Sequence, residues 1–523
     1  MIKKTIFTSI ILLTSLNANA LHNSEDSIEL RLNSLVKEVV KRNGEIVKQH
    51  LQTSIAQEQV EYEKGIYDPI INSNFTRQST NVPNSVENEL IRFQETYQDR
   101  VDYFDVGVSG LLPTGAKWSF LYTNNKKESS LIDQNKDYEK EYDSSVELSL
   151  EQPLLKDAGQ DITEAKIALS KFERQISENE YKQKLMELQG LTIQMYWRLY
   201  GAQKIYQSWK KSISLAQKSL KDLEFRAKNG KVAQTEVLEA KSAMTIRMSE
   251  YENAKNKFNE AQNQLLTLLN LPYNPNDKFE FIIADEPEND ASNLLGFDEY
   301  LNLAFENWPE YLSAKSNIKK EALQKKYSKN QSLPQLNIIG TIERTSLQNN
   351  RSDSYDQAFG PEFTSWSFGV QFSKPLLNSQ AKSSLRMAHL KLQEAKVNLN
   401  ALENNLINSI NTKIDNLRSS KKQYKLYREG LAIKKKLLNV DQNKLLMGKI
   451  NSKLMFEKEE EYMNFQRKYL SSIINWKTSE ALLEIAIGNL LNKYDINLKD
   501  LNSLSVSNQI NISEVFKNNK WKN

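Results

Sequence analysis

The chain of 523 residues contains no cysteine and only three histidines. The absence of cysteine excludes disulfides, thiol catalysis, cysteine-ligated metal sites and a lipid anchor on an N-terminal cysteine. His22, His50 and His389 are scattered, and no phosphate-binding loop or nucleophile motif stands out. The net charge of +4 is nearly neutral for this length and gives no case for a nucleic-acid partner. We therefore predict a protein that is not an enzyme and has no catalytic residues, cofactor or metal.

Long apolar runs are also missing after residue 20. Residues 1–20 have a basic start, an apolar centre and the small-residue exit Ala18-Asn19-Ala20, a pattern that predicts a secretory signal cleaved after Ala20. An uncleaved anchor is the alternative, but the apolar centre is short for a spanning helix. Any bilayer crossing by the rest of the chain would have to use strands closed into a barrel, because no later segment reaches about 18 apolar residues.

Strand-type alternation is present in both halves of the chain. Trp366, Phe368, Val370 and Phe372 alternate with small or polar residues, which predicts a strand with one apolar and one polar face. Residues 146–150 show the same pattern. We predict four strands within residues 70–152 and two within residues 335–374, separated by polar loops at residues 81–100, 124–141 and about 345–364.

Helical periodicity follows each set of strands. After Pro153 and again after Pro375, apolar residues recur at intervals of three and four, as on a coiled-coil seam. Residues 162–227 alone would form a rod of roughly 100 Å. The predicted long helices cover residues 25–64, 156–228, 232–270, 297–329, 378–446 and 450–491, with an irregularity at Arg42-Asn43-Gly44.

The two halves follow one plan, which predicts tandem helix–strand–strand–helix repeats. The first repeat spans residues 21–271 and the second residues 297–491, joined by a linker at 272–296 that is rich in Pro, Asn and Asp; residues 492–523 are a polar tail. The first half carries an inserted strand pair at residues 106–122. Six strands are fewer than the eight or so that close the smallest barrel, so several copies must contribute strands.

Several short motifs resemble the TolC-like outer membrane efflux family over essentially the whole mature length. They are Leu333-Pro334 before a strand, Gln152-Pro153-Leu154-Leu155 and Lys374-Pro375-Leu376-Leu377 after strands, residues 305–310 (FENWPE), and Gly230 followed by residues 236–239 (EVLE). The resemblance implies a mainly α-helical homotrimer whose α-helical barrel in the periplasm is joined to a β-barrel in the outer membrane. Family members usually give four strands per protomer; we expect six here, or four if the inserted hairpin lies outside the wall.

The resemblance also implies function and partners. We expect a passive exit duct of a tripartite efflux or type I secretion system, working with a periplasmic adaptor protein and an inner-membrane transporter in contact with outer-membrane lipid. An independent porin is disfavoured because a porin needs no long helical rods. A secreted coiled-coil structural protein would explain the helices but not the strands. The exported substrate does not follow from the sequence.

Candidate functional residues lie at the ends of the predicted helices. In the family, carboxylates six and nine residues after the second-repeat turn glycine line the periplasmic constriction; here these positions are Leu454 and Glu457, and the first repeat offers Glu236 and Glu239. A ring of such carboxylates would favour cations. The alternative is that each is a solvated residue on a helix face.

Two further groups complete the predicted sites. Gly230-Lys231 and Gly448-Lys449 match turn motifs that meet the adaptor in the family, although a glycine at a helix end is often only a cap. Trp118, Tyr122, Trp366 and Phe372 are candidates for a lipid-facing aromatic band.

Overall fold

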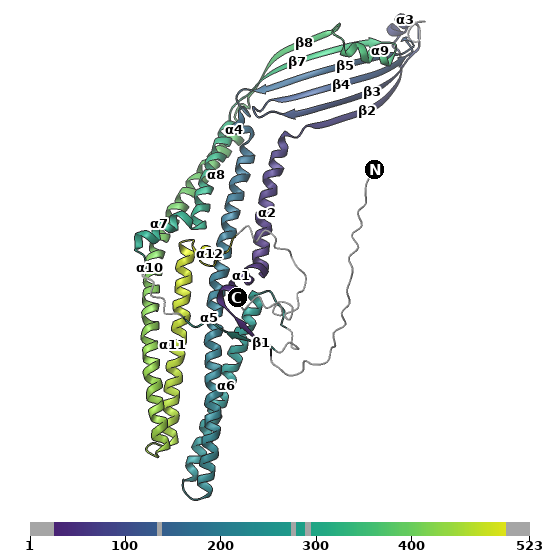
Figure 1. Ribbon diagram of the computed structural model, residues 1–523. Helices are drawn as coiled ribbons and strands as arrows, with labels where there is room; N and C mark the ends of the chain where they lie inside the picture. Colours follow the sequence, from purple (N-terminus) through teal and green to yellow (C-terminus); the bar gives the residue numbers. More distant parts are fainter. Residues whose placement is uncertain (1–25, 133–138, 274–278, 288–293, 498–523) are drawn as a thin grey trace, which may run out of the picture.

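The computed structural model describes residues 26–132, 139–273, 279–287 and 294–497. The predicted signal segment and most of the predicted polar tail lie outside the described residues. One sheet stands at one end of the chain, and long helices run away from it (Figure 1). Within the described part, every helix is too short or too polar to span a bilayer.

Two helical hairpins form the longest part of the molecule. One pairs α5 (Ala165–Lys228) with α6 (Gln234–Leu268), and the other pairs α10 (Ser379–Leu446) with α11 (Ser452–Ala486). With 64 and 68 residues, α5 and α10 are each about 100 Å long at 1.5 Å per residue. Both hairpin turns lie at the end remote from the sheet (Figure 1). The short α4 (Gln160–Thr163) precedes α5, and α12 (Leu490–Lys493) follows α11.

Two predicted helices are interrupted. Residues 297–329 form α7 (Phe297–Asn307) and α8 (Pro309–Gln331), because Pro309 holds Trp308 in an extended conformation (ψ 116°). In the first half, α1 (Leu32–Arg42) and α2 (Gly44–Lys64) meet at Asn43, whose side chain accepts a hydrogen bond from Glu45 N at 3.1 Å. The break at Asn43 agrees with the predicted irregularity, whereas the break at Trp308 was missed. A 3-10 turn, η1 (Gly65–Tyr67), follows α2.

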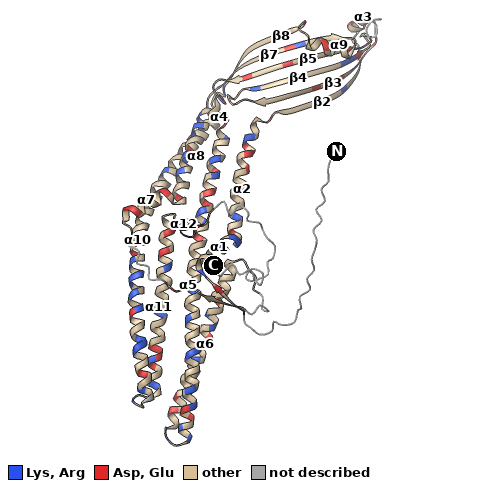
Figure 2. Cartoon of the chain, viewed as in Figure 1, with Lys and Arg blue, Asp and Glu red and all other residues tan. Residues whose placement is uncertain are grey.

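Six strands form one antiparallel sheet in the order β2-β3-β4-β5-β7-β8. They are β2 (Ile70–Pro83), β3 (Thr96–Leu111), β4 (Lys117–Ser129), β5 (Glu141–Pro153), β7 (Gln335–Gln348) and β8 (Thr364–Ser373). The inserted strand pair contributes to β3 and β4 inside the sheet, so the sheet has six strands and not four. The halves of the chain meet where β5 pairs with β7, with Leu148 opposite Ile342. Charged residues are frequent along the helices and sparse on the sheet (Figure 2).

The strand register separates the sheet into two faces. Trp118 lies opposite Leu150, Leu150 opposite Gly340, and Gly340 opposite Phe368, so apolar residues share one face across the strands. The alternate positions are mostly polar, with Ser, Thr, Asn and Glu beside a few apolar residues such as Leu121 and Ile339. On β8 the apolar face is open, since Trp366 is 77% exposed. β2 and β8 end the sheet, and each has one edge without a strand partner in the described chain.

The strand-connecting segments are more ordered than predicted. β2 and β3 extend well into residues 81–100 and flank α3 (Val86–Arg92); β4 and β5 extend into residues 124–141; β7 extends to Gln348 and is followed by α9 (Arg351–Phe359). A side chain caps the start of each helix: Ser85 Oγ accepts a hydrogen bond from Asn88 N, and Asn350 Oδ1 accepts one from Ser352 N. Helices of seven and nine residues are too short to give a periodic signal.

The structure also contains a strand pair that the sequence analysis missed. β1 (Asp26–Leu30) replaces the start of the predicted first helix, and β6 (Phe279–Ile283) lies inside the predicted linker; the two pair in parallel, with Ile28 opposite Phe281. Phe281 is fully buried. The pair therefore fastens both segments to the helical part.

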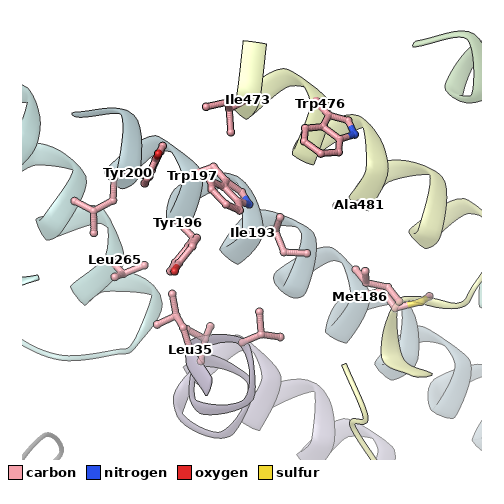
Figure 3. Close-up of a cluster of buried hydrophobic side chains, with 14 of the residues drawn as sticks. Leu35, Met186, Ile193, Tyr196, Trp197, Tyr200, Leu265, Ile473, Trp476 and Ala481 are labelled. Atoms are coloured by element: carbon pink, nitrogen blue, oxygen red, sulfur yellow. The ribbon is translucent and has the colours of Figure 1, made fainter. Parts of the chain in front are cut away.

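The main hydrophobic core lies midway along the helices, where α1, α5, α6 and α11 meet. Leu35, Tyr196, Leu265 and Trp476 come from these four helices, and each is at most 2% exposed. Figure 3 shows Leu35, Tyr196 and Leu265 gathered on one side of α5, with Trp476 of α11 on the other side. The core holds the two hairpins together at mid-length. It does not reach the hairpin turns, so other contacts must position them.

Candidate functional site

The two hairpin turns have the same backbone geometry. Gly230 (φ +67°) and Gly448 (φ +70°) are left-handed, a conformation that glycine adopts without strain. Lys231 N donates to Arg226 O at 2.9 Å and Lys449 N donates to Lys444 O at 2.8 Å, as in a Schellman cap. The glycines are therefore required by the turns themselves, and the two lysines that follow them are both exposed.

The turns differ in how the return helix begins. In the second hairpin, the Asn451 side chain accepts a hydrogen bond from Leu454 N at 3.0 Å and so satisfies one free N–H at the start of α11. In the first hairpin, Ala233 precedes α6 and has no side chain that could do this. The start of α6 therefore has less local support than the start of α11.

The structure brings two of the three predicted constriction carboxylates together. Glu239 on α6 and Glu457 on α11 are both exposed and line one cleft between the hairpins. Glu236 is half-buried near the turn and does not line this cleft. Leu454, the position where the sequence lacks the family's first carboxylate, is 38% exposed. The pair Glu239 and Glu457 thus gives the cleft two acidic side chains from different halves of the chain.

Sequence reasoning missed the ion pair at the centre of this cleft. The Arg247 Nη2 of α6 lies 2.7 Å from the Glu459 Oε2 of α11, and the two side chains are 8% and 16% exposed. Arg247 Nε donates to Ser212 Oγ of α5 at 3.1 Å, and the guanidinium lies 4.2 Å from the ring centre of Phe456. Arg247 of α6 therefore contacts one helix of its own hairpin, α5, and one of the other hairpin, α11, and no signal in the sequence pairs it with Glu459.

A second polar cluster lies beside the hydrophobic core. The Nζ of Lys493, the last residue of α12, lies 2.7 Å from Glu480 Oε1 and 3.2 Å from Glu484 Oε1 of α11. Burial acts to raise the pKa of Glu480, but the charges of Lys477 and Lys493 outweigh it and hold this pKa below the ordinary value. Burial acts to lower the pKa of Lys493, and Glu480 and Glu484 reverse that effect, so its pKa is raised. The cluster fastens α12 to α11.

The predicted lipid-facing aromatics share one face of the sheet. Trp366 and Phe372 are 77% and 64% exposed, and Trp118 is half-buried. Tyr122 differs, because α9 lies over it: its ring centre is 5.9 Å from that of Tyr355 and 6.1 Å from that of Phe359. Trp366 and Phe372 are therefore open to the surroundings on this face, Trp118 is partly covered, and Tyr122 supports α9.

Comparisons with known proteins agree with this arrangement. Residues 300–489 match the family model described as outer membrane efflux protein. The resemblance to this family is confirmed. No curated protein matches the chain. Within the described residues, no group of three or more acidic or histidine side chains could hold a metal ion.

Solved structures extend the likeness from the matched region to the whole fold. The CmeC outer membrane channel of Campylobacter jejuni is 14% identical with a TM-score of 0.63, covering 97% of this chain and 99% of that one. The MtrE outer membrane channel of Neisseria gonorrhoeae is 13% identical with a TM-score of 0.61, covering 94% and 98%. The outer membrane protein VceC of Vibrio cholerae is 15% identical with a TM-score of 0.58, covering 87% and 96%. The family is one of outer membrane efflux proteins, CmeC and MtrE are outer membrane channels, and none of these matches is described as an enzyme.

Proposed function

We propose that the chain is one protomer of a trimeric outer-membrane exit channel. The open six-stranded sheet carries the proposal, because it has an exposed apolar face and two unpaired edges. Unpaired backbone groups cannot face lipid, so the edges must be covered by strands of other copies. Three copies pairing β8 of one with β2 of the next would close an eighteen-stranded barrel that includes the inserted pair.

The helical hairpins would extend from this barrel into the periplasm as a second, α-helical barrel. Their length supports this, since a rod of about 100 Å is suited to crossing a periplasm and not a membrane. We propose that the turns at Gly230-Lys231 and Gly448-Lys449 meet a periplasmic adaptor, which links the duct to an inner-membrane transporter in a tripartite efflux or type I secretion system. The duct itself would be passive.

The cleft between the hairpins would form the closed end of the duct. Threefold symmetry would multiply Glu239 and Glu457 into a ring of carboxylates, which favours cations. Glu236, half-buried closer to the turn, would add charge at the same end. The Arg247–Glu459 pair would hold the two hairpins of a protomer together while the duct is closed. Opening would then require the adaptor to supply contacts that replace this pair.

Purified full-length protein in detergent tests the proposal directly. We expect a trimer on native mass measurement, bands that shift to the monomer on heating, and ion conductance after insertion into a planar lipid bilayer. Outer-membrane fractions should contain the heat-modifiable trimer. A stable monomer that passes no ions would overturn the proposal.

A further inference from the structure

The outer end of the sheet changes character on its apolar face. Tyr122 and Val146 pair in the apolar band, but two residues further from the long helices the same face carries Asn124 opposite Ser144, and Ser144 opposite Ser346. On the outside of a barrel this polar row would mark the limit of the lipid-facing surface. It is nevertheless almost completely buried, at 5%, 0% and 3% exposure.

Helix α9 buries this row by lying across it on the apolar face. The Ser354 Oγ lies 2.8 Å from both Ser144 Oγ and Ser346 Oγ, and 2.9 Å from the carbonyl oxygen of Tyr142. Ala358, one turn later, is fully buried and allows the helix to approach closely. Figure 1 shows α9 over the strand ends remote from the long helices. The polar row is thus satisfied by the helix and hidden from its surroundings.

The two flanks of α9 differ along the height of the sheet. The rings of Tyr355 and Phe359 lie 4.8 Å apart and pack on Tyr122, on the flank nearer the apolar band. Gln357 accepts a hydrogen bond from Gln348 at 2.9 Å, on the flank further out. Tyr355 and Phe359 remain 49% and 44% exposed although they touch the sheet. The helix therefore replaces a polar row with an aromatic edge that continues the apolar band outward.

We propose that α9 lies outside the barrel wall and docks on lipid at the outer-leaflet boundary. The proposal rests on the proposed function, which puts the apolar face of the sheet against lipid. Aromatic side chains favour the region between acyl chains and water, and the aromatic flank of α9 faces the band that begins at Trp366. The acidic side chains Asp353 and Asp356 are exposed at other positions around the helix, and in this placement their carboxylates would reach toward the headgroup region and water.

Single-cysteine spin labelling tests this directly, because the chain has no native cysteine. Full-length Tyr355→Cys and Phe359→Cys proteins, labelled with a nitroxide and reconstituted in phospholipid vesicles, should collide more often with oxygen than with a water-soluble nickel chelate. Trp366→Cys serves as the reference in the lipid band. Leu347→Cys is the matched control at the same height, because Leu347 is 53% exposed on the opposite face of β7.

The expected result is an oxygen-to-nickel collision ratio at positions 355 and 359 that is severalfold higher than at 347 and lower than at 366. If the ratios at 355 and 359 equalled that at 347, these two side chains would face water, and the proposal would be overturned. Protection from both reagents would mean that a neighbouring copy covers α9, and would overturn it as well. In either case, a high ratio at 366 would still support the proposed channel. A low ratio at 366 would contradict both the channel and the lipid contact of α9.

Discussion

The middle of the helical part and its far ends use the same helices but are packed in different ways. At mid-length, bulky side chains from four helices bury one another, and Tyr196 also donates to Asp285 at 2.6 Å. At the ends, the hairpins meet across a polar cleft where Arg247 and Glu459 form an ion pair whose side chains are only 8% and 16% exposed. Separating close-packed apolar side chains costs free energy because it exposes them to water. The groups of an ion pair can instead bind water or another protein when they separate. We therefore expect the middle of the helical part to stay fixed and the far ends of the two hairpins to move.

The largest effect should come from removing a core side chain. Trp476 is 2% exposed, and its ring centre lies 4.6 Å from that of Tyr424. Trp476→Ala should lower the free energy of unfolding by about 3–5 kcal/mol, because it removes apolar contacts and leaves a cavity. Thermal melting of the helical circular dichroism in detergent measures this. Phe225→Ala near the first turn is the control, since Phe225 is 68% exposed and should change stability by less than about 0.5 kcal/mol.

The next effect should appear at the far ends and leave the centre unchanged. Arg247→Met leaves Glu459 partly buried without its cation, at a cost of about 1.5–3 kcal/mol that falls on the contact between hairpins. We expect a higher single-channel conductance with an almost unchanged melting temperature of the core. Arg226→Met is the control, because Arg226 pairs within α5, 2.9 Å from Asp222, and both side chains are 55% exposed.

A double variant separates the ion pair from the shape of the side chain. Arg247→Met with Glu459→Met removes both charges, so no uncompensated charge remains in the cleft. Its conductance should lie closer to that of the unchanged protein than the conductance of Arg247→Met alone. If Arg247→Met conducted like the unchanged protein, the pair would have no part in closing the duct.

A smaller effect should follow pH at the edge of the core. The pKa of Glu480 is lowered in the folded chain, so its contribution to stability is present above the pKa of the unfolded chain and is lost as pH falls through the folded value. Lys493→Met removes one of its cations while burial remains. The folded pKa of Glu480 should then rise toward its unfolded value, so the variant should be less stable at pH 7 and should lose less stability between pH 7 and pH 3 than the unchanged protein, in melting curves measured over this range. The size should stay near 1 kcal/mol, because these side chains are partly exposed. Lys48→Met, at an exposed pair 3.9 Å from Glu45, should leave the acid transition in place.

The sequence predicted the features that depend on local periodicity and missed those that depend on contacts between distant segments. The rods and the six strands come from local periods of three to four and of two residues, which a strand or helix imposes on its own sequence. The parallel pair of β1 and β6 joins segments about 250 residues apart. Each strand has only five residues, which is too short for a recognisable alternation of apolar and polar residues. The ion pair of Arg247 with Glu459 spans 212 residues. Such contacts depend on how the rods lie side by side, so only the structure reveals them.

The smallest effect on stability, but a direct effect on ion selectivity, should come from removing carboxylates in the cleft between the hairpins. Glu457→Gln keeps the size of an exposed side chain and should change stability by less than about 0.5 kcal/mol. If three copies of Glu457 surround the closed end, losing three charges should lower the preference for cations, seen as a smaller reversal potential across a salt gradient in planar bilayers. Glu239→Gln should act in the same direction because it lines the same cleft. Glu252→Gln, on α6 but outside the cleft, should leave the reversal potential unchanged. Equal selectivity in all three variants would show that these carboxylates are ordinary solvated residues and that charge at the ends does not set the selectivity of the duct.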